Sequence, residues 1–320
     1  MWRIGVQRSI IVYSNSRTLV TASKNVDISG IFPPIVTPFD TDESIRYDYL
    51  EENIRRWNSI PFKGYAVHGS NGEFAYLSKE ERVEILKHVK KFATDDKVII
   101  AGSGCESTRD TIQLSNEMAS AGADALLVIT PCFYKSGMSN PAMLQHYTKV
   151  ADHSPVPIIL YSVPANTGID LSTEVICKLA EHPNIIGVKE SGGDVAKIGL
   201  MVHKTKQHDF SVLAGSGGFF LSARTVGAVG AIAAVANVLG SEMCQLDQLF
   251  KDGKTKEALS LQHRIIAPNA AVTRMFNVPG LKKSMEWFGY YGGPTRSPLQ
   301  SLTSDQEKLV KASFTENGFL

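Results

Sequence analysis

The stretch IIGVKESGGD, residues 185–194, places a lysine directly after an apolar run and directly before a glycine pair. The run over residues 185–188 predicts a short, buried β-strand. Lysine is seldom buried, and a strand end at the water line, with the aliphatic stem passing apolar neighbours, would account for it. The place of this strand in the fold therefore decides whether Lys189 is a surface residue or a functional one.

Seven further runs of the same kind occur in the 320-residue chain. They are rich in Val, Ile, Leu and Ala with little polar alternation, which is typical of parallel strands covered on both faces. Each has Gly, Pro, Ser, Asn or Thr, the residues that form turns, among its last two positions. In chain order the eight runs are GIFPPIVTPF (30–39), GYAVHGSN (64–71), KVIIAGSG (97–104), ALLVITPC (125–132), PIILYSVP (157–164), IIGVKESG (185–192), FSVLAGSG (210–217) and GAIAAVAN (230–237).

Amphipathic stretches separate these runs, as at residues 77–93 and 107–122. The first opens with Ser78 and carries Glu81 three positions later, which predicts a capping box at a helix start. Eight alternations of strand and helix are the signature of a (β/α)8 barrel. The alternative is an open doubly wound sheet, which would carry G-x-G-x-x-G after its first strand, and residues 30–39 contain no such motif. We therefore expect an α/β fold, a (β/α)8 TIM barrel.

The pattern changes after residue 240, where helical segments follow one another without strands between them. These segments cover residues 241–268, 269–276, 280–293 and 303–318, and the first includes the eighth barrel helix. The sequence thus predicts a barrel catalytic domain over residues 27–240. Residues 241–320 supply the last barrel helix and a C-terminal helical extension.

The first 26 residues have a composition of their own. They contain Arg3, Arg8, Arg17 and Lys24, four serines, and neither Asp nor Glu. A basic, serine-rich, acid-free leader is typical of an organelle transit peptide, so residues 1–26 predict a mitochondrial address. Their apolar patches are too short for a secretory signal or a membrane span. The alternative is a basic tail that carries no address.

The overall composition excludes several classes of function. The chain is 43% hydrophobic and 20% charged, with a formal net charge of +1. This near-neutral charge argues against a nucleic acid partner and against binding to an anionic membrane surface. None of the four cysteines stands in a C-x-x-C pair, so we expect free thiols in a reducing compartment and no metal site.

In a (β/α)8 barrel the chemistry takes place at the carboxyl ends of the strands. Lys189 and Tyr161 lie at such ends on adjacent strands, so an amine and a phenol are expected to face each other there. An amine can attack a ketone and form an imine, which allows a neighbouring carbon–carbon bond to break. Apolar surroundings favour the neutral, nucleophilic form of the amine. A tyrosine hydroxyl can carry the protons that these steps require.

Two glycine-containing loops admit alternative interpretations. GSNGE (69–73) offers Ser70 and Asn71 on a turn whose amide groups suit a carboxylate, although an ordinary tight turn has the same sequence. SGGD (191–194) and AGSGGF (214–219) could cradle a phosphate, as barrels often do near their last strands. We favour the alternative that these glycines serve loop geometry.

These motifs occur in an order that resembles one known family. GIFPPIVTPF, GSNGE, TPCFY, YSVPANTG, GVKESGGD and AGSGG, with a late LKK…GG…RSPL, resemble the dihydrodipicolinate synthase / N-acetylneuraminate lyase family of class I aldolases. The similarity runs from about Gly30 to Pro298. AGSGCEST, YSVPANTG, KESGGD and WFGYYGG are most similar to mitochondrial members that cleave 4-hydroxy-2-oxoglutarate to pyruvate and glyoxylate.

The resemblance implies a role for five residues. Lys189 would form the Schiff base and Tyr161 would transfer protons. Ser70 and Asn71 would receive the carboxylate of a small 2-keto acid, with Ser70 a relay to Tyr161, and Ser191 would contact the substrate. The family is typically homotetrameric and uses neither a metal nor an organic cofactor. Two alternative hypotheses remain: a lyase for another 2-keto acid, such as a sialic or sugar acid, and a non-catalytic binding protein.

Two positions depart from the family pattern. Dihydrodipicolinate synthases carry an Arg five residues after the tyrosine of the fifth strand, where it holds a second carboxylate, and this chain has Asn166. Many members have a Tyr two residues after the Thr-Pro of the fourth strand, which reaches into a neighbouring subunit's site. This chain has Phe133 there and Tyr134 next to it, so either the relay has two members or Tyr134 takes part.

Overall fold

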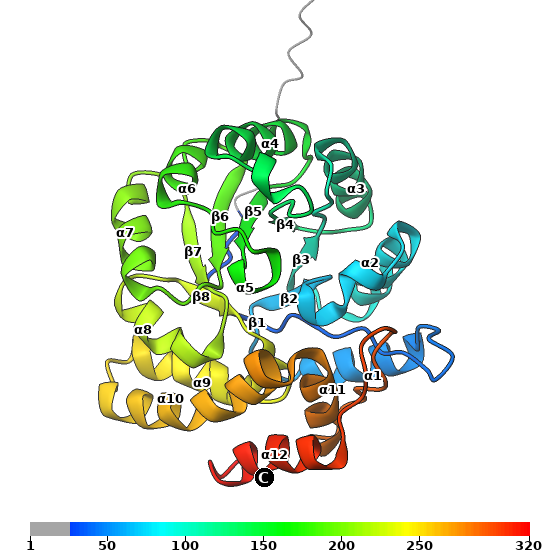
Figure 1. Cartoon of the computed structure of the whole chain (residues 1–320). Coiled ribbons are helices and arrows are strands. Elements are labelled where there is room, and N and C mark those ends of the chain that lie inside the picture. The colour runs from blue at the N-terminus through cyan, green and yellow to red at the C-terminus, as the bar shows by residue number, and fades with distance from the viewer. Residues whose placement is uncertain (1–25) are drawn as a thin grey trace, which may run out of the picture.

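The computed structural model describes residues 26–320 and contains eight parallel strands that form a barrel (Figure 1). Each of the eight predicted runs contains one strand. Within these residues the strands are β1 Ile31–Phe32, β2 Gly64–Val67, β3 Val98–Gly102, β4 Ala125–Ile129, β5 Ile158–Ser162, β6 Ile185–Glu190, β7 Ser211–Ala214 and β8 Gly230–Ile232. The strand order β1-β8-β7-β6-β5-β4-β3-β2 is that of a barrel, which confirms the predicted fold class.

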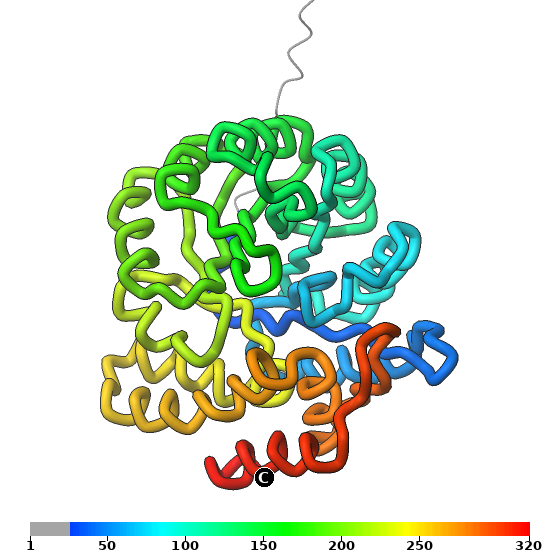
Figure 2. The backbone as a smooth tube through the Cα atoms, viewed as in Figure 1, coloured from blue at the N-terminus to red at the C-terminus, as the bar shows by residue number. Residues whose placement is uncertain are grey.

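The first strand connects both ends of this sheet. Ile31 lies in register with Ala231 of β8, and Figures 1 and 2 show β1, in blue, beside the yellow β8. On the other side Pro34 bridges Ala66 of β2, and the amide of Ile35 donates to the carbonyl of Ala66 at 3.0 Å. These bonds leave no open sheet edge at this point, as expected of a closed barrel.

Helices surround the strands, and the described helices before the extension are α1 Tyr47–Trp57, α2 Lys79–Phe92, α3 Thr108–Ser120, α4 Asn140–His153, α5 Pro164–Thr167, α6 Thr173–Leu179, α7 Val195–Thr205, α8 Phe220–Thr225 and α9 Gly240–Lys251. The predicted capping box is present, because the amide of Glu81 donates to Ser78 Oγ at 3.2 Å and the amide of Ser78 donates to Glu81 Oε2 at 2.8 Å. Short 3-10 turns include η1 Ser70–Gly72, η2 Phe74–Tyr76, η3 Lys135–Gly137, η4 Gly217–Phe219 and η5 Ala234–Asn237.

The apolar core has two parts. One fills the barrel interior with side chains from several strands, among them Phe32, Ile100, Leu127, Ile159 and Leu213. The other lies between the strands and the surrounding helices. Both faces of the sheet are therefore buried, which is the reason for the unbroken aliphatic runs in the sequence.

The C-terminal extension consists of α10 Thr255–Ala270, a π-helical turn at Ala271–Met275, α11 Asn277–Trp287 and α12 Ser304–Thr315. Figure 1 shows α12, in red, packed beside α11 at the edge of the barrel. The sequence analysis predicts that one helical segment ends at Pro268 and that another begins at residue 269. That boundary is wrong, since α10 continues through Pro268 to Ala270. The chain then forms the π-helical turn, in which the backbone hydrogen bonds span five residues instead of four.

The predicted transit peptide, residues 1–26, lies outside the described residues except for Val26. Among residues 26–320, no helix is both long and apolar enough to cross a membrane.

Candidate active site

Lys189 and Tyr161 lie side by side at the carboxyl ends of β6 and β5. They are register partners in the parallel ladder between these strands. Both are buried, with exposed fractions of 3% and 4%, and the Lys189 ammonium nitrogen lies 4.1 Å from the centre of the Tyr161 ring. Lys189 is inside the strand and does not follow it, since β6 continues to Glu190. The register thus brings a primary amine and a phenol together, as the spacing of the two residues predicts.

The third group is Ser70, which opens the turn η1 after β2. Its hydroxyl lies 3.2 Å from the Tyr161 hydroxyl, and either oxygen can be the donor. Asn166, on the short helix α5 after β5, donates its side-chain amide to Ser70 Oγ at 3.3 Å. Asn71 is buried next to Ser70. The turn therefore brings a hydroxyl and an amide to the end of the barrel where Tyr161 and Lys189 lie.

Ser191 follows β6 and is held by its backbone, whose amide donates to the carbonyl of Ser162 at 2.9 Å. Its Oγ is buried and has no hydrogen-bond partner within the part of the chain that the structure describes. Gly215 packs directly against it, because a Cβ at position 215 would lie 1.9 Å from Ser191 Oγ. Only glycine fits there.

The glycines of the β7 loop are likewise explained by packing. The amide of Gly217 donates to Asn269 Oδ1 at 3.2 Å, and the amide of Gly218 donates to Ser216 Oγ at 3.3 Å. Amides that are already bonded to side chains do not form a phosphate cradle. The loop-geometry interpretation of AGSGGF therefore accounts for these residues.

Phe133 and Tyr134 lie on the loop after β4 and point to solvent, with exposed fractions of 75% and 74%. Their rings contact each other edge to face, with centroids 5.0 Å apart. The carboxylate of Glu106 accepts the amide of Phe133 at 2.9 Å and so holds the loop. Within the described residues, Tyr134 makes no hydrogen bond to Ser70 or Tyr161. Within the described residues of a single chain, the hydroxyl next to that of Tyr161 is therefore the one of Ser70 and not that of Tyr134.

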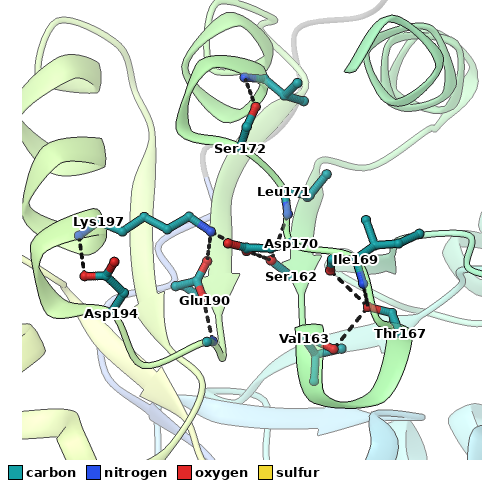
Figure 3. Close-up of polar contacts among 12 residues, drawn as sticks. Ser162, Val163, Thr167, Ile169, Asp170, Leu171, Ser172, Glu190, Asp194 and Lys197 are labelled. Carbon is teal, nitrogen blue, oxygen red and sulfur yellow. Dashed lines mark hydrogen bonds and ion pairs between the residues drawn. The ribbon is translucent and has the colours of Figure 1, made fainter. Parts of the chain in front are cut away.

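A polar network lies next to the carboxyl ends of β5 and β6 (Figure 3). Glu190 is fully buried, and its carboxylate pairs with the Lys197 ammonium group of α7 at 3.0 Å and accepts the amide of Gly192 at 2.6 Å. Lys197 also pairs with Asp170, and Asp170 accepts the hydroxyl of Ser162 at 3.1 Å. Burial raises the pKa of Glu190, while Lys197 opposes that rise.

This network joins the two loops that carry site residues. Ser162 and Glu190 directly follow Tyr161 and Lys189, so neighbouring side chains point to opposite faces of the sheet. The first residue of each pair faces the site, and the second holds the loop that follows. The sequence analysis did not single out Glu190, Lys197 or Asp170. One signal could have found them: Glu190 directly follows a lysine that faces the barrel interior, so its carboxylate faces the helices and needs a cation there.

An amine beside a phenol at the carboxyl end of a (β/α)8 barrel is the arrangement of a class I aldolase, a lyase that works through an imine on lysine. Fold and site together define this class of protein. Among residues 26–320, no group of three or more His, Cys, Asp or Glu side chains is arranged to hold a metal ion.

Comparison with known proteins identifies the family within that class. The family model described as the dihydrodipicolinate synthetase family matches residues 27–317, and the chain belongs to this family. A protein named 4-hydroxy-tetrahydrodipicolinate synthase from Haloarcula marismortui is 35% identical over 280 residues, which cover 88% of this chain and 90% of that protein. An uncharacterised DapA-like lyase of Halobacterium salinarum is 33% identical over 92% of this chain and 95% of its own length.

Solved structures show the same similarity. The chloride-inhibited dihydrodipicolinate synthase from Acinetobacter baumannii, complexed with pyruvate, superposes with a TM-score of 0.87 at 28% identity. The match covers 92% of this chain and all of that chain. The family model extends to residue 317, so the C-terminal extension is part of the sequence that the family shares.

Proposed function

We propose that this protein is a class I aldolase that cleaves 4-hydroxy-2-oxoglutarate to pyruvate and glyoxylate. The observation that supports it most is the contact of Lys189 with Tyr161, whose hydroxyl lies 3.2 Å from Ser70. The neutral Asn166 at the position where a synthase has an arginine supports the choice of substrate. Family membership supports a lyase that acts on a small keto acid.

The chemistry follows from the positions of these groups. The neutral amine of Lys189 adds to the C2 carbonyl of the substrate, and the carbinolamine loses water to give a protonated imine. Tyr161 gives its proton to the hydroxyl that leaves as water, and it then takes the proton of the C4 hydroxyl as the C3–C4 bond breaks, which releases glyoxylate. The bonding electrons pass to the imine and form the enamine of pyruvate. Protonation at C3 and hydrolysis of the imine then release pyruvate and restore Lys189.

The substrate carboxylate next to the ketone would bind at the Ser70–Asn71 turn. Its partners are the Asn71 side-chain amide and backbone amides of the turn, together with the Ser70 hydroxyl when its proton is not donated to Tyr161, and none of these is an arginine. Ser191 lies two residues after Lys189, on the loop that follows β6. Among the described residues its buried hydroxyl has no hydrogen-bond partner, so it is free to bond a ligand. We assign to it a contact with the substrate.

A second candidate is the condensation of pyruvate with aspartate semialdehyde, since relatives are named 4-hydroxy-tetrahydrodipicolinate synthase. An arginine binds a carboxylate through two charge-assisted hydrogen bonds. Asn166 has an uncharged amide that already donates to Ser70. A neutral partner holds a carboxylate less well by about 1–2 kcal/mol, which corresponds to about a tenfold loss of affinity. This difference favours the cleavage reaction.

A panel of substrates tests the proposal. We expect rapid pyruvate release from 4-hydroxy-2-oxoglutarate and at least tenfold lower turnover of pyruvate with aspartate semialdehyde. Comparable rates for these two reactions, or rapid cleavage of sialic acid, would assign a different lyase activity. If none of the 2-keto-4-hydroxy acids is cleaved, the protein is a binding protein on the same scaffold.

Substitution of Asn166 tests the residue behind the specificity. We expect Asn166→Arg to impair cleavage of 4-hydroxy-2-oxoglutarate more than Asn166→Ala does, because the arginine adds bulk and a charge beside Ser70. The measurement is kcat/KM for both variants. An Asn166→Arg variant as active as Asn166→Ala would exclude Asn166 as the specificity residue.

We also propose a mitochondrial address for residues 1–26 and a homotetrameric assembly. The address rests on the composition of the leader, and the assembly rests on family membership and the exposed pair Phe133 and Tyr134, since exposed aromatic pairs mark contact surfaces. A fluorescent fusion of residues 1–30 should enter mitochondria, and a chain that begins at Val26 should retain the activity. Light scattering should give four times the mass of one chain.

A further inference from the structure

The turn that carries Ser70 and Asn71 ends in a buried acid, Glu73. Its backbone has a φ of 55° and a ψ of 33°, the left-handed region that residues other than glycine rarely adopt. Its side chain is completely buried. A buried carboxylate on a strained backbone persists only where its surroundings hold it.

The partner of Glu73 is a lysine from the C-terminal extension. Lys282 of α11 has an exposed fraction of 1%, and its ammonium nitrogen lies 2.5 Å from Glu73 Oε1. It also donates to the carbonyl of Pro294 at 2.8 Å and lies 4.5 Å from the centre of the Phe39 ring. Burial lowers the pKa of Lys282 to about 8, and Glu73 acts in the opposite direction.

A second contact from the extension reaches the same carboxylate. The backbone amide of Arg296 donates to Glu73 Oε2 at 2.9 Å. The Arg296 guanidinium group holds Glu81 of α2 through two bonds of 2.8 Å, and it donates to the carbonyl of Tyr76 at 2.8 Å. Both oxygens of Glu73 and the chain that follows it are therefore held by residues after position 280.

On the barrel side Thr37 Oγ1 donates to the carbonyl of Gly72 at 2.7 Å, and Ser70 contacts the side chains of Tyr161 and Asn166. The contacts of Ser70 and Asn71 with the site thus depend on where Glu73 holds the end of the turn. Lys189 and Tyr161 lie on strands and are held independently by the ladder between β5 and β6.

We propose that Lys282 is a positioning residue, which through its ion pair with Glu73 fixes the Ser70–Asn71 turn where that turn binds the carboxylate of the keto acid. The inference rests on the proposed function, in which this turn receives the carboxylate. It gives the C-terminal extension a role in substrate binding. A fully buried ion pair adds little net stability compared with an apolar pair, so its value here lies in the fixed geometry of the turn.

The test measures pyruvate binding by the full-length protein without the cleavage reaction. Pyruvate is titrated in the presence of borohydride, and the reduced adduct on Lys189 is quantified by mass spectrometry, beside the melting temperature of each variant. We expect Lys282→Met to raise the half-saturating pyruvate concentration about tenfold, the factor for one lost charge-assisted hydrogen bond. The amount of adduct at saturating pyruvate should stay close to that of the unmodified protein.

Two further variants separate positioning from folding. Glu73→Gln with Lys282→Met leaves no unpaired buried charge, so it should fold even if Lys282→Met does not, and it should still show the raised half-saturation. Lys283→Met is the matched control, because Lys283 is the adjacent residue of α11 and pairs with Glu286 and Glu307 outside the turn. Its half-saturation should be unchanged.

The outcomes are distinct. Normal half-saturation in the double variant, with or without a lower melting temperature, would overturn the positioning role while leaving the proposed function intact. An equal rise in Lys283→Met would also overturn it, because the effect would then belong to α11 as a whole. No adduct on Lys189 in the unmodified protein would remove the proposed function and this inference with it.

Discussion

The hydroxyl of Ser70 lies between the Tyr161 hydroxyl at 3.2 Å and the Asn166 amide at 3.3 Å. Because the amide nitrogen of Asn166 can only donate, Ser70 Oγ is the acceptor in that bond. The Ser70 proton is then available to Tyr161. Tyr161 can give its own proton to a substrate atom and recover one from Ser70, which is what a proton relay requires.

Removal of the Tyr161 hydroxyl tests this relay. Tyr161→Phe keeps the ring that lies against the Lys189 ammonium group and removes only the oxygen. We expect kcat for cleavage to fall by about 10²–10⁴, the usual contribution of a positioned acid or base, with KM changed little. Steady-state kinetics of pyruvate release provide the measurement. A kcat within a few-fold of the unmodified protein would assign proton transfer to another group.

At the scale of elements, the network of Figure 3 links the loop after β5 to the loop after β6. Lys197 joins the two carboxylates of the network, Glu190 and Asp170. The first of these loops carries Asn166 and the second carries Ser191. Loops that carry functional residues need a rigid scaffold to position them. Here Lys197 of α7 connects the two loops.

Lys197→Met should therefore affect both stability and substrate binding. It leaves the Glu190 carboxylate buried without its cation, so the free energy of unfolding should fall by about 3–5 kcal/mol. KM for 4-hydroxy-2-oxoglutarate should rise several-fold, because the loops with Asn166 and Ser191 lose their connection. Urea unfolding and steady-state kinetics measure the two effects.

The matched control is Lys178→Met on α6, which breaks an exposed ion pair with Glu181. An exposed pair contributes at most about 1 kcal/mol, so neither stability nor KM should change noticeably. If both lysine variants behave alike, the network of Lys197 has no special role.

The strands of the barrel were predictable from the sequence because strands that are buried on both faces are unbroken aliphatic runs. The run that contains Lys189 and the run that contains Tyr161 each form a strand, and the parallel register sets the two side chains next to each other. The helix start at Ser78 was readable for the same reason, since its capping partner lies three residues away. The course of the chain through Pro268 was not, because tertiary packing decides whether a helix continues past a proline.

At the scale of the whole molecule, the contacts that escaped prediction join distant parts of the chain. Glu73 and Arg296 are 223 positions apart, and no local pattern marks them as partners. The same holds for Asn269 and Gly217, which connect α10 to the β7 loop. The resemblance to a family suggested the residues that we propose to touch substrate, whereas the residues that hold them in place became visible only with the fold.

Buried histidines make the stability of the whole molecule depend on pH. His146 of α4 has an exposed fraction of 6%, its Nδ1 lies 2.9 Å from Thr108 Oγ1, and burial lowers its pKa from 6.5 to about 4. Above pH 6.5 the ring is neutral in both the folded and the unfolded state. As pH falls from 6.5 to about 4, only the unfolded state gains a proton, so stability decreases by up to about 3 kcal/mol.

His146→Gln should reduce that loss, because glutamine can bond Thr108 and does not titrate. The measurement is the free energy of unfolding in urea at several values between pH 4 and pH 7. His153→Gln, at the exposed end of the same helix, is the control and should leave the pH dependence unchanged. An unaltered pH dependence in His146→Gln would show that other groups, such as the buried His68, determine it.

The central claim is that Lys189 forms an imine with a keto acid, and chemical trapping tests it most directly. The full-length protein is incubated with pyruvate and borohydride, digested, and its peptides are analysed by mass spectrometry. The account predicts one pyruvate-derived adduct, on Lys189, with loss of activity, and neither result in Lys189→Met. An adduct on a different lysine, or retained activity without an adduct, would contradict the account.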